Sequence, residues 1–209
     1  MDVIYKYQHL LDNEKIDWQY LSLNKNAIYI LVNNLDKINW QYLSLNKNAI
    51  HILEKNIDKI NWYYLSLNEN AILLLEHNID KVNWSMLSIN KNAIHILSQP
   101  NNINKIDYDS LVLNTNPQAI PILEKYLLSI SDDDVFWIYL GLRTHLVTLI
   151  EKHLDKIDWY YLTTNEKAIH ILEQNLDKID FIFLSGNINA IHILKNNLYR
   201  VNWHIYLEI

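Results

Sequence analysis

The sequence predicts an all-α fold, an α-solenoid of about nine 22-residue repeats in which each repeat forms two short helices. Three observations support this prediction. Tryptophans recur at intervals of 22, at Trp18, Trp40, Trp62 and Trp84. The rest of the unit repeats with them, since residues 39–60 read NWQYLSLNKNAIHILEKNIDKI and residues 61–82 read NWYYLSLNENAILLLEHNIDKV. Glycine occurs twice and proline three times, whereas asparagine is abundant, so the helices must end without the usual turn residues.

The first helix of each repeat is expected to begin at the aromatic ring. An Asp or Asn precedes each ring, and these residues are favoured N-caps because their side-chain oxygen accepts a hydrogen bond from a free backbone N–H. We expect a short helix, 3₁₀-like or α, that runs five or six residues through Trp-x-x-Leu-Ser. The predicted N-caps are Asp17, Asn39, Asn61, Asn83, Asp107, Asp158, Asp180 and Asn202.

A longer second α-helix is expected from the Asn-x-Asn-Ala-Ile segment onward, with Asn46 or Asn48 as its cap in one repeat. Its apolar residues gather on one face at about 100° per residue. The Trp column, the Leu43/Leu65/Leu87 column and the Ala-Ile column would then form a continuous core. Unequal helix lengths would curve the stack, with the shorter helices on the concave side. Left-handed C-caps are expected at Asn34, Asn56, Asn78, Asn175 and Asn197.

The chain is predicted to be a single repeat domain, residues 1–209. It comprises an N-terminal cap (1–15), regular repeats (16–98), irregular repeats with insertions (99–148), regular repeats (149–200) and a C-terminal half-repeat (201–209). A parallel β-helix is disfavoured, because Ala-Ile-His-Ile-Leu-Glu does not alternate apolar and polar residues. The irregular stretch has two interpretations, a specific epitope or drift in a loop.

The unit W-x-x-L-S-x-N-x-N-A-I-x-[IL]-L-E-x-N-x-D-K-I, which residues 40–60 match throughout, resembles the tandem repeats of many proteins of giant, mimivirus-like DNA viruses that infect amoebae. The resemblance covers nearly all of residues 16–209 and departs from the pattern in 99–148. It implies a viral origin and an interaction role, and it carries no enzymatic activity.

The amino-acid composition and net charge argue against several classes of function. The absence of cysteine excludes a disulfide scaffold and thiolate chemistry. The formal net charge of −6 argues against a phosphate-backbone partner, which favours a basic face. No signal peptide is recognisable, and no apolar stretch approaches the roughly 18 residues of a membrane span. We therefore expect an intracellular protein in the host cytoplasm, without membrane attachment.

Chemistry-bearing residues recur as repeat positions, which indicates structural roles. One histidine per layer is too sparse for a shared metal ion, and i, i+3 contacts such as His51–Glu54 and His170–Glu173 are expected instead. A nucleophile would be singular, whereas Ser22, Ser44, Ser66 and Ser88 are equivalent. We therefore expect no enzyme and no catalytic, cofactor or metal site. The recurrent histidines are His51, His95, His170 and His192.

Two columns on the first helices are the candidate partner-binding surface, since tyrosine is enriched at binding hot spots. The alternative is that these rings stack on one another and stiffen the inner wall. The leading hypothesis is a scaffold that binds a host or viral protein. The alternatives are a structural component that self-associates through its C-terminal end, and a protein that binds single-stranded nucleic acid on its tyrosines. The candidate residues are Tyr20, Tyr42, Tyr64, Tyr139, Tyr161 and Phe183, and in the more variable column Gln19, Gln41, Tyr63 and Tyr160.

Overall fold

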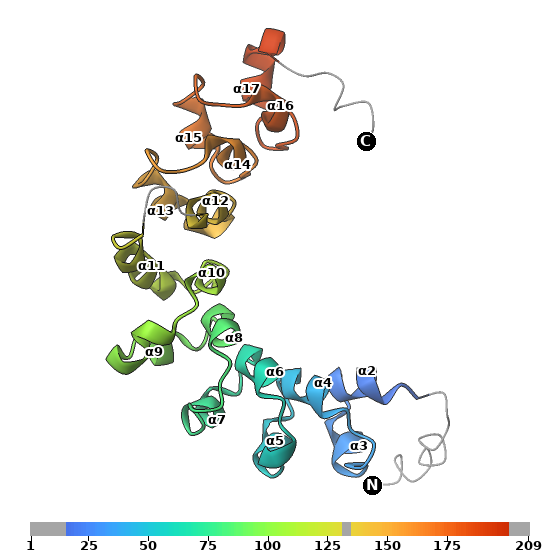
Figure 1. The fold of residues 1–209 in the computed structure, drawn as a ribbon. Coiled ribbons are helices and arrows are strands. Elements are labelled where there is room, and N and C mark those ends of the chain that lie inside the picture. Colours follow the sequence, from blue (N-terminus) through green and yellow to red (C-terminus); the bar gives the residue numbers. More distant parts are fainter. Residues whose placement is uncertain (1–15, 131–134, 201–209) are drawn as a thin grey trace. The chain divides into compact units, whose positions relative to one another are not determined.

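The structure is a computed structural model that describes residues 16–130 and 135–200. The predicted N-terminal cap and C-terminal half-repeat lie outside the described residues, as does Asn202. Every regular element in the described part is a helix (Figure 1). The chain divides into two compact units between Asp107 and Tyr108. Each unit is described by itself.

In the first unit, each repeat forms a pair of helices, as predicted. The N-cap prediction is also confirmed, because each first helix begins at its tryptophan and the preceding Asp or Asn side chain accepts a backbone hydrogen bond. Asn61, for example, accepts from the Tyr64 N–H at 3.2 Å. The pairs are α2 (Trp18–Leu23) with α3 (Ile28–Val32), α4 (Trp40–Leu45) with α5 (Ile50–Glu54), α6 (Trp62–Leu67) with α7 (Ile72–Glu76), and α8 (Trp84–Ile89) with α9 (Ile94–Leu97).

The relative helix lengths differ from the prediction. The first helices of this unit are α-helices of six residues, whereas the second helices have five residues or, in α9, four. Successive first helices nevertheless contact one another more extensively than successive second helices do (Figure 1). The first helices therefore form the inner row of the unit because they pack more closely, and not because they are shorter.

The core consists of the predicted leucine and alanine columns. Leu43, Ala49 and Leu53 are fully buried, as are their equivalents in the next two repeats. The prediction that the tryptophans belong to this core is wrong for the regular repeats, where the rings are half-buried. A lysine lies over each ring, 19 residues after Trp18, Trp40 and Trp62 and 21 residues after Trp84. Lys59 Nζ, for example, lies 4.9 Å from the Trp40 centroid. This cation–π contact accounts for a ring that is only partly covered by apolar side chains.

The asparagines that end the second helices do not adopt the predicted left-handed conformation, since no described residue has a positive φ. Asn56 has φ −136° and ψ 50°. Its side-chain amide donates to the Ile52 carbonyl at 2.8 Å, so the side chain satisfies a free helix carbonyl without a backbone reversal. Equivalent bonds are made by Asn34, Asn78, Asn175 and Asn197.

The predicted cap of the second helix is also corrected. The N-cap residue of α5 is Ala49, which makes no side-chain capping bond. Asn46 instead accepts a hydrogen bond from the Asn48 N–H at 3.1 Å and so closes the turn that precedes the helix.

A two-residue insertion at the end of the first unit leaves the contacts between repeats intact. The 3₁₀ helix Pro100–Lys105 contains the additional length. The Asp107 N–H still donates to Ser88 Oγ at 3.2 Å, and Lys105 Nζ still lies 5.0 Å from the centroid of the Trp84 ring. Here the irregularity is confined to the connecting segment.

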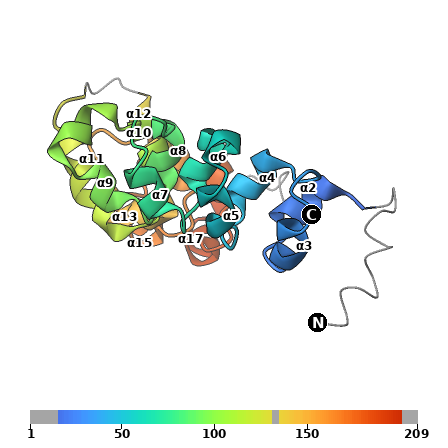
Figure 2. The same ribbon diagram turned by 90° about the horizontal axis from the view of Figure 1, so that it is seen from below.

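The second unit follows the same plan with less regular copies. In α12 the helix begins one residue before the ring, and Trp137 is fully buried, unlike the tryptophans at 18, 40, 62, 84 and 159. Figure 2 gives a second view of the helices. The elements are α10 (Tyr108–Leu111), α11 (Ile120–Leu127), α12 (Phe136–Gly141), α13 (Val147–Glu151), α14 (Trp159–Thr163), α15 (Ile169–Glu173), α16 (Phe181–Leu184) and α17 (Ile191–Asn196).

Candidate partner-binding surface

In the first unit, a buried serine fixes each first helix to the repeat that follows it. Ser66 Oγ donates to the Trp62 carbonyl at 2.7 Å and accepts from the Asn83 N–H at 3.0 Å. Ser66 is fully buried, so both bonds are shielded from water. The hydroxyl thus satisfies one carbonyl of its own helix and the N-cap amide of the next repeat. The recurrence that argued against a serine nucleophile reflects this structural role.

A column of buried asparagines joins each repeat to the one before it. The Asn68 amide donates to the Ser44 carbonyl at 2.9 Å and to the Asn46 carbonyl at 3.2 Å, while its oxygen accepts from the Asn70 N–H. Buried polar groups need such partners, and this one residue satisfies three backbone groups. The sequence signal for it was an Asn two residues after the Ser position, which every described copy has except the one at Trp137, where Arg143 stands instead. Asn46, Asn90, Asn165 and Asn187 donate in the same way to the preceding repeat.

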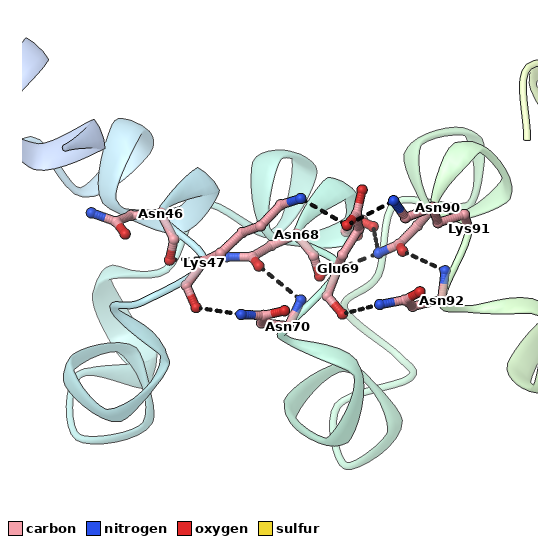
Figure 3. Close-up of polar contacts among 9 residues, drawn as sticks. Asn46, Lys47, Asn68, Glu69, Asn70, Asn90, Lys91 and Asn92 are labelled. Carbon is pink, nitrogen blue, oxygen red and sulfur yellow. Dashed lines mark hydrogen bonds and ion pairs between the residues drawn. The ribbon is translucent and has the colours of Figure 1, made fainter. Parts of the chain in front are cut away.

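A second, exposed row of polar contacts follows the connecting loops (Figure 3). Asn70 donates to the Lys47 carbonyl at 2.9 Å. Glu69 pairs with Lys47 at 2.7 Å and with Lys91 at 3.3 Å, one repeat on either side. The hydrogen bond from Lys47, with that from Lys91, holds the pKa of Glu69 below its ordinary value. Together with the buried asparagines, these contacts set a regular step between consecutive first helices.

The candidate residues lie on the inner row, but their exposure is uneven. Gln41 and Tyr63 are exposed, whereas Tyr42 and Tyr64 are half-buried. Tyr20 is 69% exposed. The column that directly follows the ring is therefore the more accessible of the two. In the remaining repeats Gln19, Tyr139 and Tyr160 are exposed, and Tyr161 and Phe183 are half-buried.

Side chains from neighbouring repeats meet on this surface. Gln41 Nε2 donates to the Tyr64 hydroxyl at 2.9 Å. In the second unit, the rings of Tyr160 and Phe183 lie 3.9 Å apart between centroids. In each unit, the two columns are thus joined between at least one pair of neighbouring repeats. These contacts support the stacking interpretation, and they also hold the rings in fixed positions for a partner.

Uncharged chemistry distinguishes this surface. Helices α2, α4, α6 and α8 read WQYLSL, WQYLSL, WYYLSL and WSMLSI, without one charged side chain. Among the first helices of the described residues, Asp109 of α10 carries the one charge. The sixth residue of each helix was missed in the sequence analysis, although at 100° per residue it falls between the two columns. We name the inner face of the first unit by its members, Gln19, Tyr20, Leu23, Gln41, Tyr42, Leu45, Tyr63, Tyr64, Leu67, Ser85, Met86 and Ile89.

The histidines lie on the exposed side of the second helices, as expected, but their predicted partners are wrong. His170 Nε2 lies 2.5 Å from Glu151 of the preceding repeat, and Glu173 contacts His192 of the following one. His95 and Glu76 form the same pair at 2.6 Å. These contacts link neighbouring second helices across 19 residues. Within the described ranges, no group of three or more His, Cys, Asp or Glu side chains is arranged to hold a metal ion.

Comparison with protein-family models, with curated proteins and with solved structures found no match to this chain. None of the helices in residues 16–130 and 135–200 has the length and apolar character required to cross a membrane. The chemistry and geometry of the inner row of first helices are therefore the basis for a functional proposal.

Proposed function

We propose that this chain is a non-enzymatic scaffold that binds a protein partner through the inner row of first helices. The observation that carries the proposal is the uncharged layer of aromatic and amide side chains that recurs on this row. Tyrosine contributes large contact area at little conformational cost, which is why it is frequent in binding hot spots.

The fixed geometry of the row favours binding. The buried hydrogen bonds of Ser66 and Asn68 set the positions of helices, and Gln41 holds the Tyr64 ring. A surface that is ordered before it binds loses less conformational entropy in the complex. The same contacts that stabilise the stack would therefore raise the affinity for a partner.

The partner is a host or viral protein in this proposal, since the repeat resembles those of giant DNA viruses. Two alternatives have less support. Nucleic acid would need cations on the face to meet its phosphates, and α2, α4, α6 and α8 carry none. The structural-component hypothesis rests on the C-terminal segment, which lies outside the described residues.

Site-specific photo-crosslinking in a lysate of amoebal host cells tests the proposal. A photoreactive phenylalanine analogue replaces Tyr63 on the inner face, and a control chain carries it at His51 on the exposed side of α5. We expect a protein adduct from position 63 and none from position 51. Excess unlabelled chain should suppress the adduct, whereas the variant Tyr42→Ala/Tyr64→Ala/Tyr161→Ala should not.

Two outcomes would contradict the scaffold. Equal labelling from both positions would mean that the inner face has no special role. An adduct of twice the chain's 25.0 kDa mass would identify a second copy as the partner and would favour self-assembly. Thermal unfolding of the triple variant must be measured in parallel, so that loss of binding is not confused with loss of fold.

A further inference from the structure

We propose that the inner face of the first unit binds an uncharged, proline-rich segment in the polyproline II conformation, with one three-residue turn of the ligand for each repeat. This inference rests on the proposed function and names the chemistry of the partner. It rests on the distance between successive first helices, on the absence of charged side chains from the face, and on the hydrogen-bond donors and aromatic rings that the face contains.

The step between repeats matches one turn of polyproline II. Each first helix packs directly on the next, and packed helices lie roughly 8–10 Å apart. Polyproline II has three residues per turn and a rise that gives about 9.3 Å per turn. Such a ligand presents the same face to every repeat, so successive turns meet the equivalents of Gln41 and Tyr42 in register.

Other peptide conformations do not match this step. Three residues of a β-strand span roughly 10 Å, but successive side chains alternate sides, so consecutive repeats would meet opposite faces. An α-helix advances by the same step in about six residues, which is not a whole number of turns. The recurrent packing of one first helix on the next therefore favours the three-fold conformer.

The chemistry of the face is complementary to this ligand. Polyproline II makes no internal hydrogen bonds, so its carbonyl groups need donors, and proline brings no N–H group that needs an acceptor. Gln41 and Tyr64 supply such donors. Because the Tyr64 hydroxyl accepts from Gln41, its own proton is directed elsewhere. Exposed rings such as Tyr20 and Tyr63 offer the flat apolar surface on which proline rings pack in aromatic-lined grooves.

Charge selects against competing ligands. Lys37, Lys59 and Lys81 lie over the tryptophan rings. Lys47 and Lys91, in the loops that follow α4 and α8, pair with Glu69. An acidic peptide or a nucleic acid strand would meet an uncharged face, and would lose hydration of its anionic groups without a cationic partner. A neutral proline-rich segment avoids this loss.

Titration of the full-length chain with a capped dodecaproline peptide tests the inference, because twelve residues span the four first helices of the unit. Amide and side-chain chemical shifts report binding by residue. We expect saturable shifts confined to the inner face, and at least a tenfold weaker affinity for hexaproline and for the variant Gln41→Ala/Tyr63→Ala. The variant His51→Ala should bind as the unchanged chain does. A capped twelve-residue Gly-Ser peptide and a twelve-nucleotide oligothymidine serve as matched controls.

The outcomes separate this inference from the proposed function. No saturable shifts with dodecaproline, shifts outside the inner face, or equal binding of the Gly-Ser peptide would overturn the ligand assignment. Tighter binding of the oligothymidine would replace it with a nucleic acid ligand. If position 63 still crosslinks to a host protein and dodecaproline does not compete, the ligand class is wrong and the scaffold stands. If neither experiment detects binding, both proposals fail.

Discussion

The side-chain amide of Asn68 lies 2.9 Å from the carbonyl oxygen of Ser44, 24 residues earlier, and the bond that it donates joins two consecutive repeats at a fully buried position. The contact between layers thus depends on a polar side chain as well as on apolar packing. It explains why asparagine, a residue usually found at the surface, recurs inside this solenoid.

Replacing Asn68 by alanine should destabilise the chain strongly. The variant leaves the Ser44 and Asn46 carbonyls without their donor, and each buried group that loses its partner costs about 1–3 kcal/mol. Urea unfolding followed by circular dichroism measures the change. Asn70→Ala is the control, because Asn70 makes the equivalent bond in an exposed setting. Equal losses in the two variants would argue against the importance of burial.

Ser66→Ala should lower the free energy of unfolding by about 1–3 kcal/mol, because the half-buried Asn83 N–H then loses its acceptor. Ser66→Thr should lose much less. The chain itself supplies this control, since Thr163 occupies the same repeat position and donates to the Trp159 carbonyl at 2.6 Å. Differential scanning calorimetry distinguishes the two. A threonine variant as unstable as the alanine variant would mean that side-chain volume, and not the hydroxyl, governs this position.

Lys59→Met should cost about 0.5–1 kcal/mol, the strength of an exposed cation–π contact. Methionine keeps the apolar length of the side chain and removes the charge above Trp40, which lies 4.9 Å from the lysine nitrogen. Chemical denaturation and the tryptophan emission spectrum report the effect. Lys55→Met, on the neighbouring second helix, is the control. Indistinguishable variants would show that the charge over the ring contributes nothing.

Glu69→Gln should reduce stability near neutral pH and have little effect in acid. The pKa of Glu69 is lowered in the folded chain, so its ionised form stabilises the fold above the ordinary pKa, and this contribution is lost as the pH falls through the lowered value. Unfolding midpoints of the two chains should therefore converge on acidification. They should also converge at high salt, because the pairs with Lys47 and Lys91 are exposed. A difference between the two unfolding midpoints that persists in acid would contradict the stabilising role of ionised Glu69.

Much of the fold could be predicted because each repeat carries local signals several times over. The Asp or Asn N-cap before the tryptophans of the first unit and the buried Leu43/Leu65/Leu87 column are properties of a single helix, and both predictions agree with the structure. The helix lengths were harder to predict from the sequence, because α5 ends where the Asn56 side chain donates to the Ile52 carbonyl. The same asparagine could equally have taken a left-handed cap.

The contacts between repeats could not be read from one repeat. Asn46 can cap a helix, close a turn or donate to a neighbouring layer, and its burial decides among these roles. The Lys59–Trp40 and His170–Glu151 contacts each span 19 residues. A helical wheel places the histidine correctly on the exposed side of its helix, but it contains no information on the layer above or below.

The contacts between the described repeats join each repeat only to its immediate neighbours. This restriction affects how such a chain can change in length through evolution. A duplicated 22-residue segment would form at both of its junctions the Ser, Asn and Lys contacts that already exist elsewhere. Gain or loss of whole copies therefore creates no new kind of junction, and neither end of the insertion needs compensating substitutions. The length of the binding face can thus vary by recombination between copies while its chemistry stays constant.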